Sequence, residues 1–138
     1  MKKLLAGLLT AFLMTAGLVA AGSSTPASAI CGDPQYPQCF RTQTGLTVKN
    51  VAPRKKSFTA TVKAVGTNAK PTGTFVFRFK KVGGGPAATV TKAVPKTGRV
   101  TLQRSFGKGT FNATVSYRPK ARSIFKASTS PTRSFTIK

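Results

Sequence analysis

Apolar and polar side chains alternate with a period of two along several short segments of this chain, and this pattern constrains its fold more than any other feature. The clearest segment is 58–65, in which Phe58, Ala60, Val62 and Ala64 alternate with Thr and Lys residues. Such alternation is typical of a strand with one buried face. Gly, Pro and Asn separate the segments at intervals of roughly ten residues. The pattern predicts an all-β sandwich, with no helical periodicity beyond residue 29.

We expect about seven antiparallel strands. The segments are 44–51, 58–65, 74–80, 88–94, 99–105, 110–117 and 133–137. The third segment places Phe75, Phe77 and Phe79 on one face, which predicts that it forms the centre of the core. Val100 and Leu102 are expected to be buried in the fifth segment, and Tyr117 at the end of the sixth.

The N-terminus has the order of residues found in a secretory signal peptide. Two lysines precede an apolar run from Leu4 to about Ala21, and small residues then close on Ala29. We expect cleavage between Ala29 and Ile30, and an uncleaved membrane anchor is the alternative. The expected organisation is a signal peptide at 1–29, a disulfide-closed loop at 30–43 and one sandwich domain at 44–138.

Two cysteines, Cys31 and Cys39, follow the expected cleavage site. In an exported protein such a pair predicts one disulfide. Closing so short a loop stabilises the native state by about 2–3 kcal/mol in the chain-entropy model, and most of that orders only the local turn. Two cysteines without histidine do not complete a metal site, so we expect a structural cross-link and no bound metal.

The charge balance is extreme. The chain has 23 Lys and Arg residues against one acid, Asp33, and the formal net charge is +22. Because the expected leader holds Lys2 and Lys3, the mature chain keeps 21 cations and a net charge of +20. Such a chain attracts anionic polymers at low salt. The alternative is a solvated basic surface that only keeps the protein soluble.

Most catalytic chemistry is excluded by composition. The chain has no His and no Glu, and Asp33 lies in the cysteine loop, so acid–base pairs are absent. No serine stands in a nucleophile motif that would give a Ser–Lys dyad. We therefore expect no enzymatic activity, no cofactor and no small-molecule substrate. With no Trp and only Tyr36 and Tyr117, ring stacking on a ligand is also disfavoured, which leaves anion recognition by Lys and Arg.

Three stretches of the chain resemble bacterial immunoglobulin-like domains, which occur, often in tandem, in secreted and cell-surface proteins. Residues 71–77 read P-T-G-T-F-V-F and are similar to the family's P-T-G-T-V-T-F strand. Residues 108–117 are similar to its P-G-T-Y-x-v-t-A-x-Y strand, and 128–130 with 135–137 to its closing strand. The resemblance implies an immunoglobulin-like sandwich used for adhesion, spacing or ligand presentation, without catalysis. After Tyr117 the chain departs from the family's S-G-D pattern and carries basic residues instead.

Alternating strand direction collects the loops at two ends of such a sandwich. One end is expected to hold the cations Lys70, Lys96, Arg118, Lys120, Arg122 and Lys126. The opposite end is expected to hold a basic turn with Arg54, Lys55 and Lys56, together with Lys80, Lys81 and Lys108. We interpret the first group and the basic turn of the second as polyanion-binding, so that one molecule could bridge two anionic chains.

These expectations combine into one leading function. The chain is predicted to be secreted and to associate non-covalently with anionic polymers such as teichoic acid or extracellular DNA, which would hold it at the cell wall by charge. No transmembrane segment is expected in the mature chain, and a sheet edge is left open to a protein partner. The alternative is a secreted cationic effector that acts on anionic membranes, although no basic amphipathic helix supports it.

Overall fold

The computed structural model describes residues 31 and 39–138, which form eight β-strands and no helix. The strands are β1 Thr42–Ala52, β2 Lys55–Ala64, β3 Gly73–Lys81, β4 Ala88–Ala93, β5 Arg99–Ser105, β6 Gly109–Pro119, β7 Ser128–Thr129 and β8 Arg133–Ile137. The expected all-β class is therefore confirmed for the described residues.

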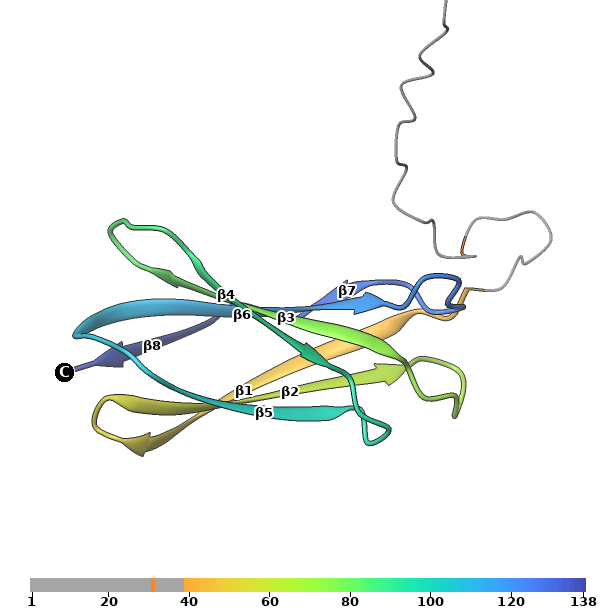
Figure 1. Cartoon of the computed structure of the whole chain (residues 1–138), viewed down its shortest axis with the longest axis horizontal. Helices are drawn as coiled ribbons and strands as arrows, with labels where there is room; N and C mark the ends of the chain where they lie inside the picture. Colours follow the sequence, from red (N-terminus) through yellow and green to blue (C-terminus); the bar gives the residue numbers. More distant parts are fainter. Residues whose placement is uncertain (1–30, 32–38) are drawn as a thin grey trace, which may run out of the picture.

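Two antiparallel sheets pack face to face as two layers (Figure 1). The first sheet has the order β1-β2-β5. The second has the order β4-β3-β6, and both β7 and β8 pair with β6. This arrangement confirms the expected β-sandwich.

The sandwich has two ends, which we name by what they carry. The disulfide end carries the loops 65–72, 94–98 and 120–127, and the chain enters β1 there after Cys39 (Figure 1). The hairpin end carries the turn at 53–54, the connections 82–87 and 106–108, and Lys138. Strand parity predicted this division of the loops.

The core lies between the sheets and is formed by the residues that the alternation selected. Phe75, Phe77 and Phe79 of β3 are buried, as predicted. Residues directly opposite one another in a ladder share a face, and the register pairs these three with Tyr117, Val115 and Ala113 of β6. Phe58 supplies the facing sheet and is also fully buried.

Aromatic rings concentrate toward the hairpin end of this core. The Phe58 ring centroid lies 4.7 Å from that of Phe79, 5.7 Å from Phe106 and 5.3 Å from Phe135, each in edge-to-face geometry. Such pairs add to the stabilisation that burial alone provides. Phe106 lies in the connection 106–108, outside every expected strand, so alternation gave no reason to place it in this cluster.

Two other expectations need adjustment. Val100 and Leu102 are half-buried rather than buried, because β5 forms an open edge of the three-stranded sheet. The short strand β7 was not predicted, since two paired residues are too few to show a period. It precedes β8 on the same side of β6, so the expected last strand has two parts.

The tight turn expected at 95–98 ties β4 and β5 to the neighbouring strand β2. The Gly98 amide donates to the Pro95 carbonyl at 2.8 Å, and the Gly98 carbonyl accepts from the Val62 amide at 2.9 Å. Gly98 has a φ of 66°, and a Cβ there would lie 2.8 Å from the Val62 carbonyl oxygen. Only glycine fits this position without strain.

The expected signal peptide at 1–29 lies outside the described residues. Within the described part of the chain, no helix is long and apolar enough to cross a membrane.

Candidate polyanion-binding surface

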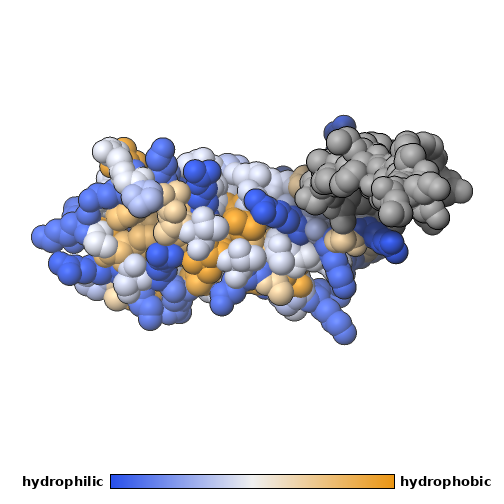
Figure 2. All heavy atoms as spheres, turned by 45° about the horizontal axis from the view of Figure 1, so that its top comes forward, coloured by the Kyte–Doolittle hydropathy of each residue, from blue (hydrophilic) through white to orange (hydrophobic). Residues whose placement is uncertain are grey.

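Positive charge dominates the part of the chain that the structure describes. Its residues include 21 Lys and Arg side chains and no Asp or Glu. Eighteen of these cations are exposed, while Lys55 and Arg104 are half-buried and Lys56 is buried. Figure 2 shows hydrophilic side chains projecting at both ends and along the edges of one face, with apolar surface between them. The exposed cations have no carboxylate side chain among the described residues to neutralise them, so their field extends into solvent.

The disulfide end carries all six cations that the sequence assigned to one end. Each of them is exposed, and they are Lys70, Lys96, Arg118, Lys120, Arg122 and Lys126. Lys70 comes from the β2–β3 loop, Lys96 from the β4–β5 turn, and the other four from the end of β6 and the loop that follows. Three connections far apart in sequence thus bring their cations to one end of the molecule (Figure 1).

The loop 120–127 is tied to the sandwich at its first turn. The Thr72 carbonyl accepts hydrogen bonds from the Lys120 amide at 3.1 Å and from the Tyr117 hydroxyl at 2.7 Å. The Ser123 amide then donates to the Lys120 carbonyl at 3.1 Å and closes a turn. Arg122 occupies the third position of that turn with a φ of 59°, a left-handed conformation that is rare for residues other than glycine. The loop backbone therefore has a defined shape that presents its cations outward.

The segment after the disulfide holds the other side of this loop. Cys31 and Cys39 lie at disulfide distance, as predicted, with their Cα atoms 5.3 Å apart. Phe40 then accepts a hydrogen bond from the Lys126 amide at 3.0 Å and donates one to the Ile124 carbonyl at 2.9 Å. Between these two bonds lies Phe125, which is 5% exposed and packs against Phe40 at 6.4 Å between ring centroids.

Two further contacts fix the same segment. The Thr42 hydroxyl donates to the Lys126 carbonyl at 2.7 Å, and the Cys31 sulfur lies 3.6 Å from the Ser123 carbonyl oxygen. Cys31 and the residues after Cys39 thus contact the cation-bearing loop, whereas the sequence indicated only a separate N-terminal cross-link.

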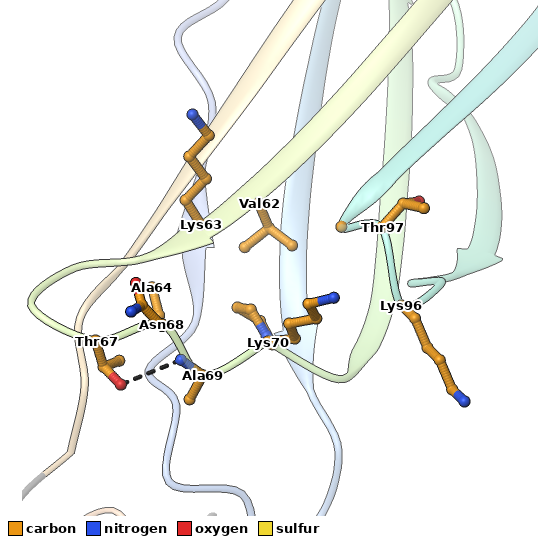
Figure 3. Close-up of a pocket in the computed structure, with 11 residues that line it drawn as sticks. Val62, Lys63, Ala64, Thr67, Asn68, Ala69, Lys70, Lys96 and Thr97 are labelled. Atoms are coloured by element: carbon orange, nitrogen blue, oxygen red, sulfur yellow. Dashed lines mark hydrogen bonds between the residues drawn. The ribbon is translucent and has the colours of Figure 1, made fainter.

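A shallow cavity of about 350 Å³ lies between the β2–β3 loop and the β4–β5 turn (Figure 3). Lys63, Lys70 and Lys96 contribute to its lining. In Figure 3 the Lys70 side chain extends toward Thr97, while Lys63 and Lys96 point away in opposite directions. The three ammonium groups do not converge on one point, so this cavity suits an extended anionic chain better than one small anion.

At the hairpin end, the expected basic turn is smaller than the sequence indicated. Ala52 pairs with Lys55, so the turn contains only Pro53 and Arg54. Lys55 and Lys56 were expected in the turn but begin β2 instead. The prediction was wrong here because clear alternation of apolar and polar side chains begins only at Phe58. Arg54 is exposed and Lys55 half-exposed, whereas Lys56 points into the sandwich and is 8% exposed.

Tyr117 is the one group of the described residues with a clearly shifted pKa. Burial raises the pKa of Tyr117 to about 12, and a hydrogen bond with Ser123 acts in the opposite direction. The side chain is fully buried, as predicted, and its hydroxyl supports the loop rather than facing a ligand. Among the described residues, no group of three His, Cys, Asp or Glu side chains could hold a metal ion.

No protein-family model matches the chain, and no curated protein matches it either. Its function must be argued from its own residues. Sequence reasoning missed Lys63, which lines the cavity beside Lys70, although its outward position in the alternating segment 58–65 was a usable signal. It also missed the supporting contacts of Phe40 and Phe125, for which no local pattern existed.

Proposed function

We propose that this chain is a secreted immunoglobulin-like module that associates non-covalently with anionic cell-surface or extracellular polymers through its Lys and Arg side chains. One observation carries the proposal: 18 exposed cations surround a sandwich whose described residues contain no carboxylate side chain. A polyanion that contacts several of these cations releases its condensed counterions, and this release drives binding without any shaped pocket.

The distribution of the cations favours a polymer over a small ligand. They occupy both ends of the sandwich and come from nearly every strand and loop. A single small anion could contact only a few of them, whereas a chain of phosphates lying across the disulfide end could reach Lys70, Lys96 and the loop 120–127. Teichoic acid and extracellular DNA are both such phosphate chains.

Recognition in this proposal rests on charge rather than on ring stacking. Phe58, Phe75, Phe77 and Tyr117 are fully buried, and the other described aromatic side chains are buried or half-buried against the core. Base or sugar stacking needs aromatic faces that are open to solvent. We therefore expect binding with little preference for sequence or sugar.

The strand order supports the immunoglobulin-like part of the proposal. A sheet of β1-β2-β5 facing a sheet of β4-β3-β6 with β8 corresponds to strands A-B-E facing C′-C-F-G of an immunoglobulin sandwich that lacks strand D. The stretches 71–77 and 108–117, which carry the family resemblance, form β3 and β6 at the centre of the second sheet. Folds of this kind commonly serve binding or spacing, so the fold alone does not identify the ligand.

Fractionation of producing cells tests both secretion and retention by charge. We expect the protein in the medium and in the wall fraction, and we expect salt at about 0.5–1 M to release the wall-bound part, because that concentration screens charges beyond a few ångströms. A protein that stays in the membrane fraction after the salt wash would contradict the proposal. Leakage of dye from anionic vesicles at similar protein concentrations would instead support an effector that acts on membranes.

A further inference from the structure

A second recess lies at the hairpin end, far from the disulfide. It has a volume of about 420 Å³ and is lined by Asn50, Val51, Ala52, Pro53, Lys56, Thr136 and Lys138. The β1–β2 hairpin forms one side and the end of β8 the other. The two walls belong to different sheets, and the Arg133 side chain of β8 bonds the Leu46 carbonyl of β1 at 3.3 Å. Residues of β1, β2 and β8 line the recess, so strands of both sheets frame it.

Lys56 is the only buried residue among those that line the recess. It precedes Phe58 by two positions on the inner face of β2, and its ladder partners are Asn50 of β1 and Arg104 of β5. The Lys56 ammonium donates a hydrogen bond to the Asn50 side-chain oxygen. Asn50 is neutral, so this bond satisfies one donor without balancing the charge. A buried ammonium is costly unless an anion compensates it.

The neighbouring cation adds to that demand for an anion. Arg104 lies directly opposite Lys56, and like charges that face each other across a ladder repel. The Arg104 guanidinium lies over the Phe79 ring at 5.5 Å from the centroid and over the Phe106 ring at 5.7 Å. Cation–π attraction to those two rings stabilises the charge of Arg104. They leave Lys56 as the cation of this pair that faces the recess.

We propose that this recess binds a single phosphate group, free or as an ester. Lys56 and Lys138 supply two ammonium groups, and the Asn50 side-chain amide and the Thr136 hydroxyl supply neutral donors. A phosphate carries up to two negative charges and several acceptor oxygens, which match two lysines better than one carboxylate does. The recess shares no residue with the disulfide end, so the phosphate site can fail while polymer binding at the disulfide end holds.

Titration of the full disulfide-bonded chain with inorganic phosphate at low ionic strength, followed by amide and lysine ammonium NMR signals, tests the site. We expect saturable shifts at Asn50, Lys56, Thr136 and Lys138. Lys56→Met should weaken phosphate binding by at least about tenfold, since it removes a charged hydrogen-bond donor. The matched control, Lys92→Met, removes the same charge from an exposed lysine of β4 and should leave phosphate binding nearly unchanged.

A second variant keeps the test decisive if Lys56→Met does not fold. Lys138→Gln with Thr136→Val changes only exposed residues and should weaken phosphate binding several-fold while Lys56 remains. Glycerol 3-phosphate that binds like inorganic phosphate, with dimethyl phosphate much weaker, would identify a monoester or free phosphate. The reverse order would identify a phosphodiester. Shifts that spread over all exposed cations without saturation would overturn the proposal, and so would wild-type affinity in both variants. Either result would hold independently of whether the protein binds DNA.

Discussion

The two ends of the sandwich carry similar numbers of cations but hold them in different ways. At the disulfide end, six exposed cations stand on loops or at the end of β6, and hydrogen bonds to Thr72 and Phe40 fix the backbone of the loop 120–127. At the hairpin end, Lys56 and Arg104 lie opposite each other on the inner faces of β2 and β5. Arg104 lies over phenylalanine rings, and Lys56 bonds the Asn50 side chain. The cations of the disulfide end are exposed to solvent, whereas two cations of the hairpin end are partly or fully buried between the sheets.

Because of this difference, the exposed cations can bind a polyanion, whereas the buried cations need a compensating partner within the fold. Exposed loop cations contribute little to folding, so they are free to contact a polyanion without a cost in stability. Inner-face cations are already engaged with rings and with Asn50, and their removal should affect folding or a local anion site instead. Net charge alone therefore does not define the binding surface.

The largest expected effect comes from the aromatic cluster that supports the hairpin end. Phe58→Ala removes a fully buried ring with three edge-to-face partners and should lower the free energy of unfolding by about 3–5 kcal/mol. Phe125→Ala, the matched change at the disulfide end, should cost less because Phe125 has one ring partner among the described residues, Phe40. Denaturant unfolding of both variants measures this, and equal costs would show that the ends are supported alike.

A smaller effect is expected from the hydrogen bond beneath the cation-bearing loop. Tyr117→Phe removes the donor to the Thr72 carbonyl but keeps the buried ring. The free energy of unfolding should fall by about 1 kcal/mol, the usual contribution of one such bond. In the same variant, amide exchange at Lys120 should become faster, since its partner is the same carbonyl. Unchanged exchange at Lys120 in this variant would show that the Tyr117 hydroxyl does not stabilise the loop.

The same tyrosine predicts a pH dependence. Burial raises the pKa of Tyr117 from 10.0 to about 12, so the folded state holds this proton more tightly than the unfolded state does. Its contribution to stability is complete below pH 10 and is lost as the pH rises from 10 to 12. The difference in unfolding free energy between wild type and Tyr117→Phe should therefore shrink across that range. A constant difference would contradict burial of this hydroxyl.

Reduction of the disulfide should have the smallest effect on global stability. Cys31–Cys39 closes a short loop at the edge of the sandwich, so the melting temperature should fall by only a few degrees. The local effect should be clearer, because the Lys126 amide donates a hydrogen bond to the carbonyl of Phe40, the residue directly after the cross-link. Amide exchange at Lys126 should accelerate in the reduced protein, while amides of β3 stay protected. Loss of all protection would mean that the cross-link supports the whole core.

The sequence predicted most of the sandwich because its strands are half-buried and alternate cleanly. Phe75, Phe77 and Phe79 illustrate this, since a period of two assigns all three to the core without any knowledge of the partner strand. Alternation gives no signal where burial depends on distant packing. Phe106 and Phe125 lie in connections, and nothing in their neighbours indicates that they fill the core.

The candidate site was predicted to a similar extent. Strand parity was sufficient to bring Lys70, Lys96 and the loop 120–127 to one end, because antiparallel strands fix the end at which each loop emerges. Parity could not show that Lys56 turns inward, since that depends on a hairpin of only two turn residues. It also could not show that Phe40 pairs with the loop, a contact between segments 85 residues apart.

The salt dependence of binding to duplex DNA tests most directly whether the disulfide end is the polyanion-binding surface. We predict that changing Arg118, Lys120, Arg122 and Lys126 to Gln makes the slope of log affinity against log salt shallower by up to ~3–4, at about 0.9 for each phosphate that the variant no longer neutralises. The matched variant, with Arg54, Lys80, Lys81 and Lys108 changed to Gln, removes the same charge from exposed residues of the hairpin end and should change the slope less. A disulfide-end variant that folds normally and keeps the wild-type slope, or equal changes in both variants, would contradict this account.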